Sequence, residues 1–490
     1  MIGAALSLAL CSTALGSCSG NRSDQVTSEA PDIDSAWEGK TEKQLREAIE
    51  GAPSNGLKAD LFLKGGEKGG ALTVAALKYA SALANGYADP KKLHEVYTIP
   101  HQKVDVRPGL KQAIDKGDVK GWLETLVPQT DEYRALGQAH LHYLKLASAT
   151  QFQPVPEGEP MKPGSGDARV GAVAAALRTA GYLVQPQQSA PAPRAQGNAA
   201  PKSAPQPVYS GAMVVAVKRL QGEFGFEQDG IIGGNTLNAL NAGPAFRARQ
   251  IAVAMERLRW LPRNSPETRI DVNTAAAFLD YYRDGQIVDH RNVVTGEGDK
   301  PTPQLQSPIY RLVAKPTWTV PKGIGEKEIA TKGPRWLAEN DFIMKDGLYV
   351  QQSGDKNSLG LVKFDMDNDH AIYLHDTPAK ALFGMPERHR SHGCVRVQNA
   401  MQFAMMLAGQ EGVTDEFTKA MQGEEQQVFV KLPQPIPVRL LYHTVFWDGS
   451  KLQFRQDVYG WDENIARALG LAPGKPEKID QPESSDDIGP

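Results

Sequence analysis

The chain has 490 residues, which is too long for one ordinary hydrophobic core and predicts several domains. Its 54 Lys and Arg residues nearly balance 57 Asp and Glu residues, and the net charge of −3 leaves no basic face of the kind that nucleic acid requires. The charges are also too well mixed for a polybasic membrane-binding surface. We therefore expect no nucleic acid partner.

The first residues are typical of an export signal. Residues 2–15 are apolar and small, too few to span a bilayer as a stable helix but suited to the apolar region of a signal peptide, although no Lys or Arg precedes them. They run into Leu15-Gly16-Ser17-Cys18, which resembles the lipobox of bacterial lipoproteins. The resemblance implies a lipoprotein signal peptide at 1–18, lipid on Cys18, a tether at 19–34, and an exported, periplasmic protein anchored to a membrane. A plain signal peptide cut near this point is the alternative.

The cysteine content singles out one thiol. The chain has three cysteines, Cys11, Cys18 and Cys394. Cys11 would leave with the signal and Cys18 would carry lipid, so Cys394 has no partner for an intramolecular disulfide. Because exported proteins meet an oxidising environment, a lone thiol there is a liability unless it is buried or used.

Residues 35–150 predict a helical scaffold domain. The segment 41–49 starts with a capping-type Thr and carries apolar residues at helical spacing, and 72–83 repeats the pattern. Residues 151–166 are rich in Pro, Gly and Glu and predict a linker.

Residues 167–243 predict a second helical unit, with helices at 167–180, 211–224 and 236–240. The run 186–207 of Pro, Ala, Gln and Ser cannot bury a core and is expected to be a disordered insertion. AVKRLQGEFGFEQDGIIGGNTLNAL, with LRTAGYLV before the insertion, resembles the three-helix peptidoglycan-binding module of cell-wall enzymes. The resemblance implies glycan binding, which the insertion could weaken. Alternatively, the DG-x-x-G stretch only makes a turn that glycine permits.

The predicted secondary structure changes after residue 243, from helices to one connecting helix followed by β-rich runs. Residues 244–266 predict a basic amphipathic connecting helix with a solvated face. Residues 267–450 predict a mostly-β domain with a few helices, and 451–490 a C-terminal segment with an acidic tail. The expected β-rich runs are 269–272, 286–294, 309–313, 371–374, 427–432 and 438–445.

Two stretches carry candidate chemistry, YLHDT at 373–377 and SHGCVR at 391–396. A cysteine attacks an acyl carbon as the thiolate, so it needs a neighbouring base, and histidine has a suitable pKa. His392 precedes Cys394 by two residues, so both would face the same side of an extended segment, whereas His375 ends an apolar strand-like run. Gly393 lets the backbone bend, which could aim amide groups at a developing oxyanion.

A zinc site is the metal-binding alternative for the same residues. His375, His392 and Cys394 could supply three ligands, but no fourth ligand is evident and the usual spacing of structural zinc sites is missing. We therefore expect neither a metal nor a cofactor.

At this point a family resemblance becomes specific. HDTPAKALFGMPERHRSHGCVRV resembles the signature of the L,D-transpeptidase (YkuD-type) catalytic domain, with Arg396 in place of the commoner Asn. AMERLRW, KPTWTVP, NSLGLVKFDM and VRLLYHTVFWD are similar to the large multi-domain branch of that family. The resemblance implies a multi-domain α+β fold: a helical scaffold and a three-helix peptidoglycan-binding module, followed by a mostly-β catalytic domain at 267–450 with a lid at about 318–360.

The resemblance also implies roles and a reaction. Cys394 would be the nucleophile and His375 the general base and then acid, while His392 and Gly393 would shape the site and its oxyanion environment. The residues that would orient the base or bind substrate carboxylates are Tyr373, Ser391 and Arg396.

The implied reaction is transpeptidation in cell wall biogenesis, with peptidoglycan stem peptides and glycan as partners. A tetrapeptide donor would be cut before its terminal D-Ala, and the acyl group would form a 3-3 cross-link to a second stem. Water as acceptor would instead make an L,D-carboxypeptidase or endopeptidase, and an amine on another protein would make an anchoring enzyme. A non-catalytic wall-binding protein is disfavoured because both His375 and Cys394 are present.

Overall fold

The computed structural model describes residues 37, 39–101, 103–184, 206–474 and 489–490. The expected signal peptide with Cys18, the tether at 19–34 and most of the 186–207 insertion lie outside the described residues. Within the described ranges, no helix combines the length and the apolar character needed to cross a membrane.

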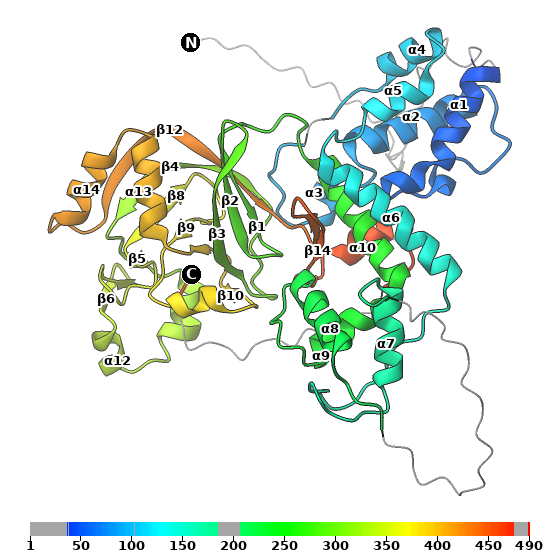
Figure 1. The fold of residues 1–490 in the computed structure, drawn as a ribbon. Helices are drawn as coiled ribbons and strands as arrows, with labels where there is room; N and C mark the ends of the chain where they lie inside the picture. The colour runs from blue at the N-terminus through cyan, green and yellow to red at the C-terminus, as the bar shows by residue number, and fades with distance from the viewer. Residues whose placement is uncertain (1–36, 38, 102, 185–205, 475–488) are drawn as a thin grey trace, which may run out of the picture.

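The first half of the chain is helical and forms two groups, with α6 and α10 between them (Figure 1). In α1, Thr41, Leu45 and Ile49 are buried at a spacing of four residues, as one face of a helix requires. The helices in chain order are α1 (Gly39–Glu50), η1 (Ala52–Asn55), η2 (Ala59–Leu61), α2 (Gly70–Asn85), α3 (Pro90–Leu93), α4 (Arg107–Asp115), α5 (Val119–Thr125), α6 (Asp131–Ala149), α7 (Val170–Thr179), α8 (Ala212–Glu223), α9 (Gly234–Asn241) and α10 (Gly243–Trp260).

The α10 helix is central rather than peripheral, so the expectation of a solvated face is wrong. Val253 and Trp260 belong to the core of the scaffold, whereas Ile251 and Met255 belong to the core of the α7–α9 unit. Its charged residues are buried as well, and those of its last turns are Glu256, Arg257 and Arg259. The helix therefore joins two hydrophobic cores along opposite sides.

Ion pairs and hydrogen bonds compensate the buried charges of α10. Arg257 Nη1 lies 2.5 Å from Asp462 Oδ1, and Arg259 Nη2 lies 2.5 Å from Glu256 Oε2. Glu256 also accepts hydrogen bonds from Trp260 Nε1 at 3.1 Å and from the Ala88 amide at 2.7 Å. Pairing and additional hydrogen bonds are what make buried charges tolerable. Asp462 belongs to α15 (Asp462–Ala468), so the C-terminal segment returns to pack on α10.

Residues 151–166 contain neither helix nor regular strand, yet they pack against the α7–α9 unit. Val155 and Met161 are buried in its core, and Met161 forms an isolated β-bridge with Ile232.

The second half of the chain is built on a nine-stranded sheet. Successive pairings run from β3 through β11, β9, β8, β4, β12, β1 and β2, and β2 pairs with β3 again, so the strands close into a ring. The strands are β1 (Arg269–Asn273), β2 (Phe278–Arg283), β3 (Gln286–Gly296), β4 (Gln306–Ala314), β8 (Val362–Met366), β9 (Leu374–His375), β10 (His389–Ser391), β11 (Val395–Val397) and β12 (Val428–Leu441).

Helices cover one side of this sheet, where Phe403 and Leu407 of α13 (Ala400–Gln410) pack into its core. The remaining elements of the half are η4 (Lys380–Gly384), α14 (Thr414–Gln422), β13 (Val445–Trp447) and β14 (Leu452–Phe454).

A separate small sheet, of order β5-β7-β6, forms the body of the segment from 318 to 351. It has its own apolar cluster around Trp318, Ile329 and Phe342, against which Tyr373 of the main domain packs. We call this segment the lid. Its elements are β5 (Trp318–Thr319), α11 (Lys322–Ile324), the π-helix η3 (Gly325–Ile329), α12 (Pro334–Glu339), β6 (Phe342–Lys345) and β7 (Leu348–Gln351). The arrangement confirms the expected fold class, helical units followed by a mostly-β domain (Figure 1).

Candidate active site

Two short parallel strands place four of the expected residues on one face. In the register of β9 and β11, His375 lies opposite Arg396 and Leu374 lies opposite Val395. Because side chains alternate along a strand, Tyr373 shares a face with His375, and Cys394 shares a face with Arg396. Cys394 is 5% exposed, His375 is fully buried and Arg396 is 1% exposed, so the site is closed to solvent in this structure.

The ring of His375 is held in one tautomer. Its Nδ1 lies 2.5 Å from the carbonyl oxygen of Asp376, which can only accept, so Nδ1 carries the hydrogen. Nε2 therefore holds a lone pair, and it makes no hydrogen bond within the described part of the chain. Burial, reinforced by the Arg396 guanidinium, holds the pKa of His375 well below its ordinary value. The imidazole is thus a neutral base with Nε2 available.

Cys394 is a protonated thiol in this closed state. Burial raises the pKa of Cys394 to about 11, although contact with Tyr373 and the nearby cations Lys363 and Arg396 oppose that rise. Its Sγ donates to the carbonyl oxygen of Ala371 at 3.6 Å. No hydrogen bond joins Cys394 to His375 among the described residues. The protonated thiol is therefore strongly favoured over the thiolate while the site is buried.

A hydroxyl braces the turn that carries Cys394. Gly393 has φ of +115°, a conformation that side chains other than glycine rarely adopt. Its amide donates to Ser391 Oγ at 3.2 Å, and the Ser391 hydroxyl donates to the carbonyl oxygen of Cys394 at 2.6 Å. Thr302 Oγ1 donates to the carbonyl oxygen of Gly393 at 2.9 Å. Both of these hydrogen bonds of the Ser391 hydroxyl therefore lie within its own turn.

His392 faces the lid. Its Nε2 lies 2.6 Å from Glu328 Oε1, on the π-helix of the lid, and 2.7 Å from Lys300 Nζ. Lys300 Nζ also lies 3.5 Å from Glu328 Oε1. This group, Lys300, Glu328 and His392, is called the latch below. It ties the lid to the residue two positions before Cys394.

The last two residues of the chain lie against Arg396. Gly489 and Pro490 are both buried. A Cβ added to Gly489 would stand 2.8 Å from Arg396 Nη2 and 3.5 Å from the Cβ of Ser358. Gly489 therefore lies beside the guanidinium of Arg396.

Several residues of the site were not found by sequence reasoning. Lys363 of β8 lies 4.0 Å from the centre of the Tyr373 ring and 2.7 Å from Asp365. Lys363 and Asp365 are two residues apart in VKFDM, so their side chains lie on the same face of a strand, and this spacing could have indicated the pair. Glu328 and Lys300 carried no local signal, since their contacts with the motif cross long stretches of sequence.

A cavity of about 200 Å³ lies beside Tyr373, lined also by Trp318 of the lid and Lys363. As for metals, no group of three or more His, Cys, Asp or Glu side chains in the described ranges is arranged to hold an ion.

Comparisons with known proteins assign families to three parts of the chain. Residues 267–414 match the L,D-transpeptidase catalytic domain (YkuD), residues 70–139 match the scaffold domain, and residues 167–240 match the putative peptidoglycan binding domain.

A putative L,D-transpeptidase of Haemophilus influenzae is 28% identical over 240 residues, which are 44% of this chain and 49% of the relative. The chain therefore spans about half the length of the curated relative it matches.

Two solved structures are similar at low identity. An Enterococcus faecium L,D-transpeptidase variant is 16% identical and covers 37% of this chain and 52% of its own, with a TM-score of 0.21. The L,D-transpeptidase of Xylanimonas cellulosilytica is 17% identical and covers 59% of this chain and 100% of its own, with a TM-score of 0.22. The strands and turn that position Cys394 and His375 fall within the matched residues 267–414, so the chain carries an L,D-transpeptidase catalytic domain of the YkuD family, together with a scaffold domain and a peptidoglycan-binding domain.

Proposed function

We propose that this protein is a peptidoglycan L,D-transpeptidase that forms 3-3 cross-links between stem peptides through an acyl-enzyme on Cys394. The observation that carries the proposal is the His375 ring, a buried neutral imidazole whose Nε2 lone pair is available on the face that Cys394 shares. A general base needs this protonation state before the reaction begins.

Acylation begins when the lid opens and a tetrapeptide stem enters. His375 Nε2 takes the proton of the Cys394 thiol as Sγ attacks the carbonyl carbon of the third residue. The bond from that carbon to the nitrogen of D-Ala breaks, the imidazolium returns the proton to that nitrogen, and D-Ala leaves. The product is a thioester on Cys394.

Transfer reverses the proton movements. The side-chain amine of a second stem attacks the thioester carbon and gives a proton to His375 Nε2. The carbon–sulfur bond breaks, and the imidazolium reprotonates Sγ. The new amide is the cross-link, and both Cys394 and His375 return to their resting states.

The oxyanion of each tetrahedral intermediate requires hydrogen-bond donors. The amide of Gly393 already donates to Ser391, so the amide of Cys394 is the donor we assign. Gly393 and Ser391 then act by fixing that turn. His392 shapes the site from the lid side, and Tyr373 packs beside Cys394. Arg396 supplies the guanidinium for a substrate carboxylate.

Other acceptors use the same acyl-enzyme. Water would give an L,D-carboxypeptidase or endopeptidase, and an amine on another protein would give an anchoring enzyme. A non-catalytic peptidoglycan-binding protein would need neither the available Nε2 of His375 nor a thiol sharing its face.

The setting of the enzyme belongs to the same proposal. Peptidoglycan as substrate places the protein in the bacterial envelope, in keeping with an export signal and with lipid on Cys18. The peptidoglycan-binding domain at 167–240 would bring it to the glycan.

The test is product analysis by mass spectrometry after incubation of the purified protein with a disaccharide-tetrapeptide. Cross-linked dimers support transpeptidation, and tripeptide alone indicates a carboxypeptidase. Cys394→Ser should abolish both products and His375→Ala should nearly do so. Normal turnover by Cys394→Ser would refute the acyl-enzyme.

A further inference from the structure

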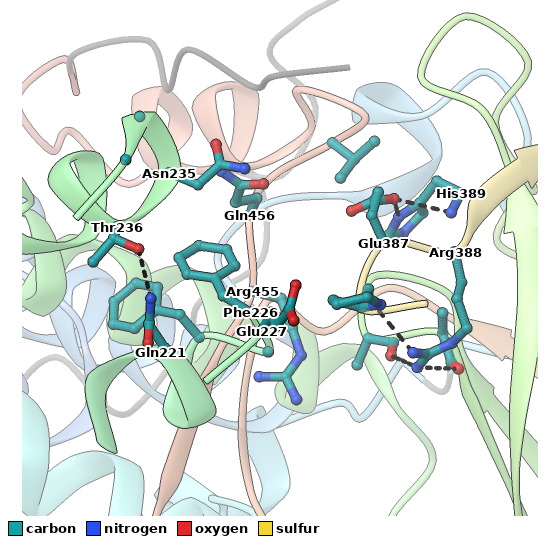
Figure 2. A pocket seen from close by; sticks show the side chains of 18 of the residues that line it. Gln221, Phe226, Glu227, Asn235, Thr236, Glu387, Arg388, His389, Arg455 and Gln456 are labelled. Carbon is teal, nitrogen blue, oxygen red and sulfur yellow. Dashed lines mark hydrogen bonds and ion pairs between the residues drawn. The ribbon is translucent and has the colours of Figure 1, made fainter. Parts of the chain in front are cut away.

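A second cavity, of about 450 Å³, lies between the peptidoglycan-binding domain and the catalytic domain (Figure 2). One wall comes from residues 221–236, the turn and helix start of the binding domain. The opposite wall comes from residues 275–277 and 386–389 of the catalytic domain, and residues 455–458 of the C-terminal segment close the cavity. Its volume is in the range of ligand sites.

The cavity presents an aromatic ring beside uncommitted polar groups. Phe226 is half-buried against Phe224, with ring centroids 5.9 Å apart, and lines the cavity. Gln456 Nε2 donates to Asn235 Oδ1 at 3.1 Å, which leaves the Asn235 amide nitrogen and the Gln456 amide oxygen without a partner in the described ranges. The exposed carboxylate of Glu227 likewise forms no hydrogen bond or ion pair with another described residue.

These groups favour a neutral, hydroxyl-rich ligand over an ion. Glu227 would repel an anion, while Arg455 at the same cavity would oppose a cation. A sugar ring offers an apolar C–H face to an aromatic side chain, and its hydroxyl and acetamido groups both donate and accept hydrogen bonds. Phe226, Asn235 and Gln456 supply that combination.

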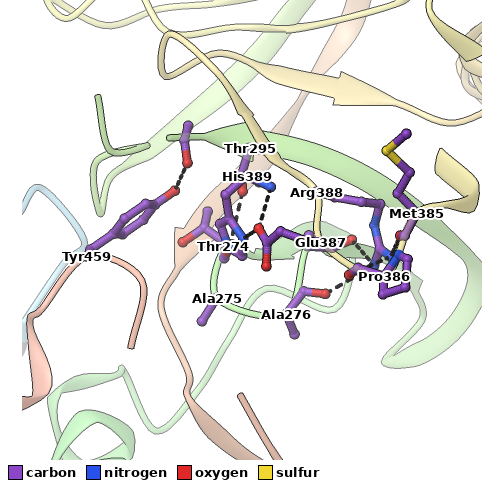
Figure 3. Close-up of polar contacts among 12 residues, drawn as sticks. Thr274, Ala275, Ala276, Thr295, Met385, Pro386, Glu387, Arg388, His389 and Tyr459 are labelled. Carbon is purple, nitrogen blue, oxygen red and sulfur yellow. Dashed lines mark hydrogen bonds and ion pairs between the residues drawn. The ribbon is translucent and has the colours of Figure 1, made fainter. Parts of the chain in front are cut away.

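The catalytic-domain wall of the cavity is a firmly held segment (Figure 3). Arg388 donates to the carbonyl oxygens of Ala276 and Ala277 at 3.3 Å and 3.0 Å. His389 Nε2 lies 2.9 Å from the carbonyl oxygen of Thr274, and its Nδ1 pairs with Glu387. The hydrogen bonds of Arg388 and His389 are thus made within the wall, so we expect the residues on the opposite side of the cavity to bind the ligand.

This wall runs directly into the catalytic motif. His389 begins β10, five residues before Cys394, so the two Cα atoms are no more than roughly 18 Å apart at full extension. The wall of the cavity is therefore continuous along the chain with the segment that carries Cys394.

We propose that this interdomain cavity binds the N-acetylated glycan strand of peptidoglycan and thereby presents the attached stems to the catalytic domain. The inference rests on the proposed function, since it names a binding site for the polymer that carries the stem-peptide substrate. Phe226, Asn235 and Gln456 are the recognition residues.

The experiment measures the binding of peptide-free glycan strands to the full chain by calorimetry. Wild type should bind, and both Phe226→Ala and the double variant Asn235→Ala/Gln456→Ala should weaken binding at least tenfold. Tyr87→Ala, which removes a 40% exposed aromatic ring from the scaffold, is the matched control and should bind as wild type does. Unchanged affinity in the cavity variants would overturn the inference.

Hydrogen exchange locates the strand independently. Bound strands should protect both 224–236 and 386–391, and protection confined to other segments would overturn the inference. Turnover of a sugar-free tetrapeptide should be unchanged in the cavity variants. Failure of wild type to process the disaccharide-tetrapeptide would refute the proposed function, whereas lost turnover of the sugar-free tetrapeptide in the cavity variants alone would refute the separate binding role assigned here.

Discussion

Breaking the latch should expose Cys394 without unfolding the protein. Glu328→Ala removes the 2.6 Å hydrogen bond between His392 and the lid, which involves a charged acceptor, and the 3.5 Å ion pair with Lys300. Bonds to charged groups contribute about 1.5–3 kcal/mol when sheltered. The Glu328 side chain is 29% exposed, so solvent screening reduces the expected loss to about 1–2 kcal/mol. That loss favours the open lid by a factor of roughly 5–30.

The assay is the rate at which a thiol reagent labels Cys394, in a background where Cys11 and Cys18 are serine. Because Cys394 is 5% exposed in the closed state, labelling reports lid opening. Glu326→Ala on the same π-helix is the control, since that side chain is 67% exposed and, within the described ranges, its ion pair is with Lys322 alone. Equal labelling rates for Glu328→Ala and wild type would refute the latch.

Three further outcomes follow from the geometry. In nitrogen NMR spectra of the resting enzyme, His375 should show the Nδ1–H tautomer. It should not titrate near pH 6.5, because burial lowers its pKa. A titration midpoint of His375 near pH 6.5 would contradict the buried neutral base. Asp462→Asn should lower the free energy of unfolding by about 3–5 kcal/mol, since it leaves Arg257 buried without its 2.5 Å partner; denaturant titration measures the loss, and a change below 1 kcal/mol would contradict it. Gly393→Ala should lower the free energy of unfolding by about 1–3 kcal/mol through backbone strain, and it should also lower kcat/KM. Gly384→Ala is the control, because that position has open space and no positive φ, and it should leave the free energy of unfolding and kcat/KM unchanged.

The secondary structure that the sequence predicted well is the part governed by local pattern. The helices expected at 72–83 and 211–224 are α2 and α8, with ends shifted by one or two residues. The runs 427–432 and 438–445 were expected as two strands, but residues 428–441 form one strand, β12, with an irregularity between Lys431 and Ile436. Proline has no backbone N–H to donate to a neighbouring strand, so a proline-containing stretch is typical of a strand end. In this structure the strand continues through the stretch with a bulge.

Buried charge explains the misreading of α10. Alternating charged and apolar residues ordinarily indicate one exposed face. Here Arg257 finds Asp462, and Arg259 finds Glu256 together with the hydroxyl of Tyr133 at 2.8 Å. Asp462 and Tyr133 lie far from α10 in the sequence, so no local sequence pattern could have predicted that both faces of α10 are buried.

In the candidate site, too, some features follow from the local sequence and others depend on contacts between distant residues. The sequence suggested Cys394 and His375 as candidates, because His375 ends an apolar strand-like run and Cys394 lies in the SHGC motif of the following loop. It could not supply the latch, whose members Lys300 and Glu328 reach His392 across 92 and 64 residues of sequence. Nor could it supply the resting protonation states of His375 and Cys394, which depend on the burial of both side chains.

Burial limits the reactivity of the Cys394 thiol in this structure. With a pKa of about 11, only about one part in ten thousand of Cys394 is thiolate at pH 7. An ordinary exposed cysteine would be thiolate at about the level of a few per cent. Because oxidants react with the exposed thiolate, burial and the raised pKa protect Cys394 together. The burial that raises the pKa of Cys394 also lowers the pKa of His375, so the protonated thiol and the neutral imidazole have the same physical cause.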